Sequence, residues 1–178
     1  MFSRILLPPY ESLKHLEGKG NYALKKYYQF PYSLFYKHKL KMVVQMIERH
    51  YGNCLDFGSG PGIFLPELKR HASRVIGYEK DEKLDNRLNF DLIVCSSVLE
   101  FCDLEPTLDF LKEILKPSGH LIVASPMRSP LSKAYFSIIK DKNKRHSDID
   151  IINAISSKFK ITQKKNWLGL YFCLKATK

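Results

Sequence analysis

The stretch that decides the fold is Cys54-Leu55-Asp56-Phe57-Gly58-Ser59-Gly60-Pro61-Gly62. Its apolar beginning predicts the end of a buried strand, and its alternating glycines predict a tight turn. A helix is expected to follow over residues 62–71. Glycines keep side chains away from such a turn, so a ligand can approach the backbone closely. The first amides of the helix would point at that ligand, which makes the turn a candidate binding site.

The spacing of the glycines argues against a dinucleotide. The dinucleotide fingerprint G-x-G-x-x-G requires glycine at position 63, where this chain has Ile63. Asp56 precedes the turn, and a carboxylate there repels a diphosphate but attracts an ammonium group. A ligand that ends in an amino-acid zwitterion therefore suits the turn better than a diphosphate does.

The motif Leu-Asp-x-Gly-x-Gly-x-Gly, at residues 55–62, resembles the first motif of class I S-adenosylmethionine (SAM)-dependent methyltransferases. The resemblance covers roughly residues 34–175 and is strongest over 53–126. It implies an α/β fold, a three-layer Rossmann-like sandwich whose mostly parallel sheet has an antiparallel last strand. It also implies SAM as the cofactor. The residues expected to bind it lie in the turn and after neighbouring strands: Asp56, Gly58, Ser59, Gly60, Gly62, Glu79, Ser96 and Ser97.

Glu79 ends the second predicted strand, residues 74–79, and lies about 20 residues after Gly58. An acid at this position can accept hydrogen bonds from both ribose hydroxyls of an adenosyl group, as in dinucleotide folds. The alternative is a surface glutamate at a strand end. The combination with the glycine turn favours ribose binding.

The connection between Glu79 and the next predicted strand, residues 90–95, is unusually short. A crossover needs about 10–12 residues, so only one short helix near 81–87 fits. The third strand of the family is therefore predicted to be missing or vestigial, which is tolerable because it lies at the sheet edge. The loop that usually carries the adenine-binding acid is lost with it, and Asp85 is a candidate substitute.

The segment Ser96-Ser97-Val98-Leu99-Glu100-Phe101 resembles the "VLEH" signature of one methyltransferase subgroup, with Phe101 in place of the histidine. In such proteins this loop lies against the methionine part of the cofactor. A catalytic role of that histidine is not available here, and no catalytic residue is assigned. Methyl transfer from a sulfonium mainly requires alignment of donor and acceptor, so a strong catalytic group is not needed. Residues 115–126 match a further family pattern and predict a strand over 120–125.

Charge divides the predicted single domain, residues 1–178, into three parts. The net charge is +11, and it is concentrated in an N-terminal helical lid or flank, 1–50, and in substrate-side helices and a C-terminal hairpin, 127–178. The SAM-binding core, 51–126, is acidic. The basic flanks are either solvated surface or a site for an anionic partner, which would be a phosphorylated or carboxylated small molecule, an anionic lipid or RNA.

The substrate side is expected to involve Tyr22, Tyr27 and His146. The two tyrosines belong to a tyrosine- and lysine-rich segment that would cover the cofactor or lie on a membrane surface. His146 precedes a helix, residues 148–158, that Ser147 caps. Its ordinary pKa lies near neutrality, so it is either a substrate-side base or a loop histidine.

Other classes of protein are disfavoured by composition. The four cysteines lack CxxC spacing and the histidines are scattered, so no metal site is expected. No apolar run reaches the ~18 residues of a membrane span, and we expect a cytoplasmic protein. The predicted function is methyl transfer to a small-molecule or lipid-like acceptor. The alternatives are a methyltransferase-fold binding protein with weak catalysis and an RNA methyltransferase, which the aromatic and basic N-terminus favours.

Overall fold

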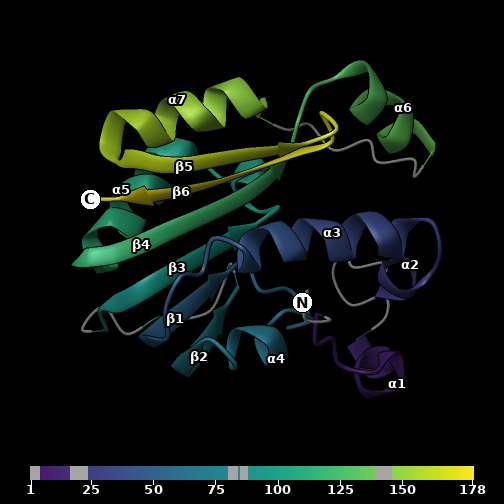
Figure 1. Ribbon diagram of the computed structural model, residues 1–178, viewed down its shortest axis with the longest axis horizontal. Helices are drawn as coiled ribbons and strands as arrows, with labels where there is room; N and C mark the ends of the chain where they lie inside the picture. The colour runs from purple at the N-terminus through teal and green to yellow at the C-terminus, as the bar shows by residue number, and fades with distance from the viewer. Residues whose placement is uncertain (1–4, 17–23, 80–83, 85–87, 139–145) are drawn as a thin grey trace.

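The computed structural model describes residues 5–16, 24–79, 84, 88–138 and 146–178. Its centre is a six-stranded sheet with the order β2-β1-β3-β4-β6-β5 (Figure 1). The strands are β1 (Tyr51–Phe57), β2 (Ala72–Tyr78), β3 (Phe90–Ser96), β4 (Leu115–Pro126), β5 (Lys160–Trp167) and β6 (Tyr171–Thr177). Strands β2, β1, β3 and β4 pair in parallel, and β6 is antiparallel to both of its neighbours. The predicted mostly parallel sheet with an antiparallel last strand is therefore confirmed.

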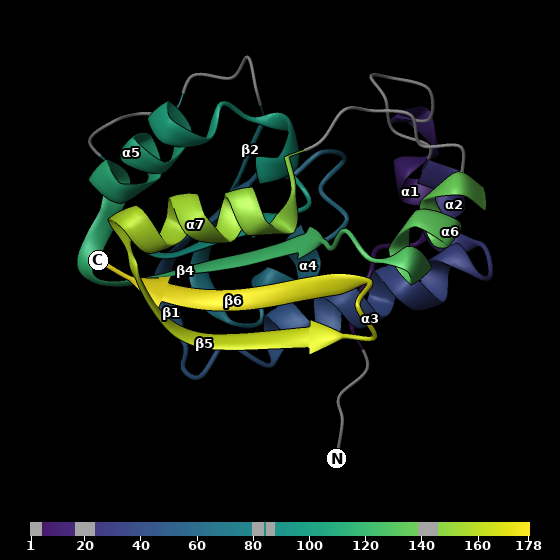
Figure 2. The same cartoon turned by 90° about the horizontal axis from the view of Figure 1, so that it is seen from above.

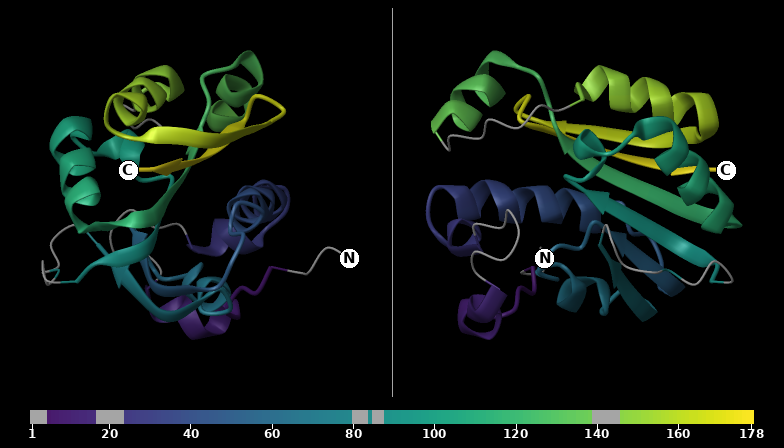
Figure 3. Two further views of the ribbon diagram at one scale, coloured as in Figure 1. Left: turned by 60° about the vertical axis from the view of Figure 1, so that its left-hand side comes forward. Right: turned by 180° about the vertical axis from the view of Figure 1, so that it is seen from behind.

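Helices cover both faces of the sheet, which gives the predicted three-layer α/β sandwich (Figures 1 and 3). Helices α3 and α4 cover one face, and α5 and α7 cover the other. The helices are α1 (Tyr10–Leu13), α2 (Leu24–Tyr28), α3 (Tyr32–Val44), α4 (Leu65–Leu68), α5 (Leu104–Ile114), α6 (Pro130–Ile138) and α7 (Asp148–Lys158), with 3₁₀ turns η1 (Lys14–Leu16) and η2 (Leu99–Phe101). Figure 2 shows α1, α2 and α6 beyond the carboxyl end of the parallel strands.

The central strand β3 is apolar on both faces because both faces are covered. Successive side chains of a strand point to opposite faces. Ile93 and Cys95 accordingly pack in the core that α5 and α7 close, whereas Leu92 and Val94 pack in the core under α3. The continuous apolar run of β3 therefore contributes to two cores, one on each face of the sheet, with alternate residues in each.

Among the described residues, no element corresponds to the third strand of the family, in line with the short connection. Strand β2 lies at the sheet edge, and among the described residues no strand follows it before β3. The predicted short helix at 81–87, with Asp85, falls outside the described residues apart from Leu84. An edge strand can be lost without opening a gap inside the sheet, which is why the remaining order is intact.

Two predicted boundaries are wrong. The helix expected over residues 62–71 is the single turn α4, because Gly62 has φ +74°, which a right-handed helix excludes, and β2 already begins at Ala72. The strand expected to begin at His120 begins at Leu115, because Leu115 pairs with Phe90 of β3. By contrast, the predicted Ser147 cap of α7 is confirmed as a reciprocal capping box with Asp150.

Candidate cofactor site

The glycine turn lies at the carboxyl end of β1, in the middle of the parallel part of the sheet. The chain leaves β1 toward β2 on one side and then crosses to β3 on the other. In open α/β sheets this reversal leaves a crevice at the carboxyl ends of the two diverging strands, where ligands bind. The predicted cofactor residues therefore lie at the place where this architecture binds ligands.

Left-handed backbone makes glycine necessary in the turn. Gly58, Gly60 and Gly62 have φ values of +73°, +54° and +74°. The N–H groups of Gly58 and Ser59 both donate to the carbonyl of Tyr78, at 2.8 and 3.1 Å, which holds the turn against the end of β2. A Cβ atom on Gly58 would lie 2.3 Å from Val98 Cγ2, so no larger residue fits there.

Glu79 is brought directly to this turn. Its Oε1 accepts a hydrogen bond from the N–H of Gly60 at 2.5 Å. The carboxylate therefore lies beside the peptide groups that were predicted to face the cofactor. This is the place expected for an acid that binds ribose hydroxyls, and it comes from the neighbouring strand end, as predicted.

Asp56 is a buried acid beneath the turn, with an exposed fraction of 2%. Burial raises the pKa of Asp56 to about 7, the positive charge of Lys39 opposes this rise, and the negative charge of Glu79 adds to it. A buried carboxylate is stable only when opposite charge or hydrogen-bond donors accompany it. The position is therefore suited to a cationic ligand group such as an ammonium.

Lys39 of α3 is a site residue that the sequence interpretation missed. Its exposed fraction is 5%, and its Nζ donates to Ser97 Oγ at 2.8 Å. The ammonium also lies over the rings of Tyr36 and Tyr171, 5.0 and 5.8 Å from their centroids. A signal was present, because Lys39 lies three residues after Tyr36 and four before Val43. That spacing puts a lysine on the buried face of the helix.

The loop after β3 completes the polar lining. Ser97 has φ +59° and donates its N–H to the carbonyl of Ala124 at 2.7 Å, which fixes the loop on β4. The hydroxyl of Ser96 is buried and has no hydrogen-bond partner among the described residues. A buried hydroxyl without a partner is costly, and a polar ligand group would relieve that cost. The residues present therefore fit a zwitterionic, ribose-bearing cofactor.

Aromatic side chains of the N-terminal segment lie next to Lys39, whose ammonium is 5.0 Å from the ring centroid of Tyr36. The ring of Tyr27 contacts those of Tyr32 and Tyr36, with centroids 5.3 and 4.5 Å apart. Burial raises the pKa of Tyr36 well above its ordinary value, and the nearby Tyr27 and Asp56 add to the rise. Tyr27 thus reaches the site through Tyr36. Tyr22 lies outside the described residues, so its substrate-side role stays a prediction.

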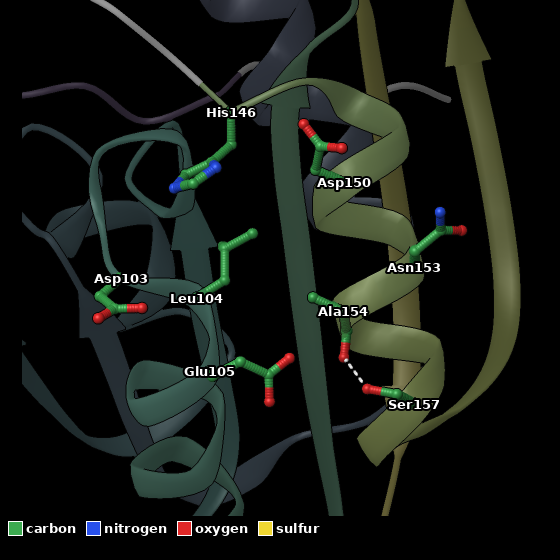
Figure 4. A pocket seen from close by; sticks show the side chains of 8 residues that line it. All are labelled: Asp103, Leu104, Glu105, His146, Asp150, Asn153, Ala154 and Ser157. Atoms are coloured by element: carbon green, nitrogen blue, oxygen red, sulfur yellow. Dashed lines mark hydrogen bonds between the residues drawn. The ribbon is translucent and has the colours of Figure 1, made fainter.

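His146 lines a groove of about 530 Å³ between the start of α5 and α7 (Figure 4). Its Nε2 is 3.0 Å from the carbonyl oxygen of Cys102, and its backbone N–H donates to the carbonyl of Glu100. The other lining residues are Asp103, Leu104, Glu105, Asp150, Asn153, Ala154 and Ser157. None of these is a predicted cofactor residue. The structure therefore does not place His146 among them, and its role as a base stays a prediction.

Two absences concern only the residues that the structure describes. Within them, no group of three or more His, Cys, Asp or Glu side chains is arranged to hold a metal ion. No helix in that part of the chain is long and apolar enough to cross a membrane.

The comparison with known families agrees with this geometry. A family model described as a methyltransferase domain matches residues 29–163. The chain belongs to the methyltransferase domain family. The matched range includes the glycine turn, the Glu79 strand end, the loop after β3 and Lys39. No curated protein has a matching sequence.

Solved methyltransferase structures share the fold. The N-methyltransferase NodS from Bradyrhizobium japonicum WM9, in complex with S-adenosyl-L-homocysteine (SAH), superposes with a TM-score of 0.67 at 16% identity over 95% of this chain and 97% of NodS. Magnesium protoporphyrin IX methyltransferase from Synechocystis PCC 6803, also with bound SAH, gives 0.57 at 12% identity, over 95% and 94% of the two chains. An O-methyltransferase family protein from Burkholderia thailandensis gives 0.59 at 17% identity, over 80% and 56%.

Proposed function

We propose that this methyltransferase-domain chain transfers a methyl group from SAM to a small-molecule or lipid-like acceptor. The family membership and the SAH complexes of NodS and of the Synechocystis enzyme support SAM as the donor. The observation that carries the proposal is the buried pair of opposite charges, Asp56 and Lys39, at the glycine turn. An amino-acid zwitterion would offer each of these side chains an opposite charge.

The polar side chains at the site would then have separate tasks. Asp56 would accept from the α-ammonium of the cofactor, and Lys39 would donate to its α-carboxylate. Glu79 would accept from the ribose hydroxyls, beside the Gly60 amide that already holds its carboxylate. The hydroxyl of Ser96 would gain the hydrogen bond that no described residue gives it. When bound, SAM supplies the electrophilic methyl carbon of its sulfonium.

Methyl transfer also requires that the methyl donor and the acceptor are aligned, and the aromatic rings at the site can provide this alignment. Tyr27 and Tyr36 pack over the buried charges and would exclude water from the reacting groups. Excluding water strengthens every electrostatic contact in the site, and orientation alone can supply much of the rate of a displacement reaction. We therefore assign these rings to enclosure of the site.

Calorimetric titration with SAH tests the proposal. We expect wild-type protein to bind SAH, and Lys39→Met to bind it about 10–100-fold more weakly because a hydrogen bond between charged groups is lost. Lys37→Met is the matched control, since Lys37 lies on the same helix with an exposed side chain. Its affinity should equal that of the wild type.

The alternative is a methyltransferase-fold binding protein with weak catalysis. Two features favour it: Phe101 replaces the histidine of the subgroup signature, and the part of the chain that the structure describes has no third strand. Absence of heat with wild-type protein at millimolar SAH and SAM would support this alternative. An equal loss of affinity in the Lys39 and Lys37 variants would contradict the assignment of Lys39.

A further inference from the structure

Large apolar side chains are exposed at the carboxyl end of the sheet. Phe30, Leu34, Leu131 and Leu168 have exposed fractions of 83%, 56%, 52% and 66%. They belong to the α2–α3 loop, the first turn of α3, the first turn of α6 and the tip of the β5–β6 hairpin. Figures 1 and 2 show these elements gathered at the same end of the molecule. Elements gathered in this way can bring their exposed apolar residues into one interaction surface.

Direct contacts join these elements into one surface. Ser129, just before α6, donates its hydroxyl to the carbonyl of Gly169 in the hairpin tip at 2.7 Å. The adjacent Trp167 stacks on His38 of α3 with ring centroids 4.1 Å apart and contacts Phe35 at 5.5 Å. The tip of the hairpin therefore connects α6 to α3, and we call this combined surface the basic-apolar face.

Exposed lysines lie on the same elements as these apolar residues. The sequence has no Asp or Glu at residues 18–47, 114–140 or 151–178, the ranges that supply all four elements. Exposed Lys26, Lys37 and Lys133 lie on α2, α3 and α6, and Lys164 and Lys165 precede the hairpin tip. The nearby α1 carries one acid, Glu11, which pairs with Lys14 at 3.7 Å. Uncompensated positive charge around exposed apolar side chains is the composition of a surface that binds anionic lipid.

We propose that the basic-apolar face docks on an anionic lipid membrane. The leucines would enter the interface while the lysines meet lipid phosphates. Of the four exposed apolar residues, only Phe30 has a π-face on which a nucleic-acid base can stack, and three are leucines, so the surface fits lipid better than single-stranded RNA. Docking would also present the carboxyl end of the sheet to acceptors in the membrane, and only this last step rests on the proposed function.

Co-sedimentation with vesicles tests the inference. The probes are vesicles of phosphatidylcholine alone and vesicles of phosphatidylcholine mixed with phosphatidylglycerol. We expect binding to the anionic vesicles only, with a loss of about 25-fold for the double variant Lys26→Gln/Lys37→Gln. Lys69→Gln/Lys160→Gln removes the same charge from exposed residues outside the face and should bind like the wild type.

A second pair of variants separates lipid from RNA. Leu34→Ser/Leu168→Asn should lose at least about tenfold in vesicle binding because apolar burial is lost. Ile149→Ser on α7, with its side chain 65% exposed, is the control. Asparagine suits position 168 because Leu168 has φ +50°. Circular dichroism melting checks that each variant is folded.

The outcomes are distinguishable. Failure of wild-type protein to bind anionic vesicles, or an equal loss in the control variants, overturns the inference. Binding to a single-stranded oligonucleotide that the lysine variant loses and the leucine variant keeps, without vesicle binding, overturns it in favour of RNA. SAH titration of the same variants should be unchanged, so a failure of membrane docking with intact SAH binding leaves the proposed function standing.

Discussion

The carboxyl group of Asp56 is held in an environment that disfavours its charge. Its pKa rises from 3.8 to about 7 because the group is buried, although Lys39 lies close enough to oppose the rise. Ionisation of Asp56 therefore opposes folding increasingly as the pH rises between these two values. An ammonium group of a ligand would stabilise the ionised carboxylate. The buried acid therefore lowers the stability of the free protein, and ligand binding would restore it.

The raised pKa predicts that cofactor binding depends on pH near neutrality. As the pH falls through about 7, Asp56 takes up a proton and can no longer pair with an ammonium group. If binding must release that proton, SAH affinity should be about fivefold weaker at about pH 6 than at about pH 7. Calorimetry at both values measures it. Asp56→Asn should bind more weakly at both and lose this dependence, and an unchanged dependence in that variant would contradict the assignment.

The sequence predicts which residues meet at the site where those residues lie in one turn or at the next strand end. Asp56 and the glycines lie in one turn, and Glu79 lies at the next strand end, so motif spacing predicts that they meet. Lys39 is separated from the turn by the end of α3, a loop and strand β1. Whether its ammonium reaches Ser97 depends on how α3 crosses the sheet, which only tertiary packing determines.

The turn and the loop after β3 are interlocked elements. Val98 lies over Gly58 so closely that a Cβ atom there would meet its Cβ at 2.6 Å. The same Gly58 N–H is fixed to the carbonyl of Tyr78. Three strand ends are thus held together at one glycine, which explains why the turn has little tolerance for substitution.

We predict that Gly58→Ala is destabilising by more than about 2 kcal/mol, because overpacking against Val98 adds to the cost of a left-handed alanine. Gly62→Ala is the matched comparison. It has nearly the same φ, but its Cβ would meet only the end of the Leu65 side chain at 3.0 Å, which can move. Its cost should be about 1 kcal/mol. Urea unfolding measures both, and equal losses would show that backbone conformation alone decides the effect.

A fully buried acid on α4 anchors the N-terminal segment. Glu67 accepts a hydrogen bond from the N–H of Leu6 at 2.6 Å, forms an ion pair with Arg70 at 3.2 Å, and lies 3.2 Å from Nε2 of His71. The single turn of α4 is therefore more than a connection between strands. It links the segment that leads to α1 and α2 to the body of the fold.

Removing this anchor should loosen the N-terminal segment selectively. Glu67→Leu eliminates the acceptor of the Leu6 amide and leaves Arg70 unpaired, so we expect a loss of about 1–3 kcal/mol in unfolding free energy. Hydrogen exchange should become faster over residues 5–16 and stay unchanged in β3 and β4. Glu105→Gln, an exposed ion-pair residue, should cost less than about 1 kcal/mol. Uniformly faster exchange would contradict a selective anchor.

Elements were predictable from sequence when their signals were local. The β3 apolar run and the Ser147 cap both gave correct elements, because alternation and capping act within a few residues. The predicted length of the helix after the glycine turn was wrong because that length depends on where β2 begins. The predicted start of β4 was wrong because Leu115 pairs with Phe90, a contact made only in the assembled sheet.

On the scale of the whole molecule, the sheet is shortened on the side of β2. The resemblance to class I methyltransferases places the adenine-binding acid in the loop of the third strand, and no such strand lies among the described residues. The methionine and ribose ends of the site, by contrast, have Asp56, Lys39 and Glu79. Affinity should therefore come mainly from those two ends of the cofactor.

This asymmetry predicts weak discrimination of the base. S-inosyl-homocysteine differs from SAH in having a carbonyl in place of the adenine amino group and a hydrogen on N1. We expect it to bind within about threefold of SAH, since no third-strand loop lies among the described residues to bind this edge of the base. Competition calorimetry measures the ratio. A loss above about 30-fold would show that a donor-specific contact to the base exists, and Asp85→Asn would then identify whether Asp85 makes it.

Trp167 is the chain's one tryptophan, and it lies at the junction of α3 with the β5–β6 hairpin. With excitation selective for indole over the tyrosines, its emission is therefore a single-site optical reporter. Because the ring sits between the helix that carries Lys39 and the tip that carries Leu168, cofactor addition and vesicle addition can each be followed in an unlabelled protein. A shift with one titrant and not the other would tell which side of the junction has moved.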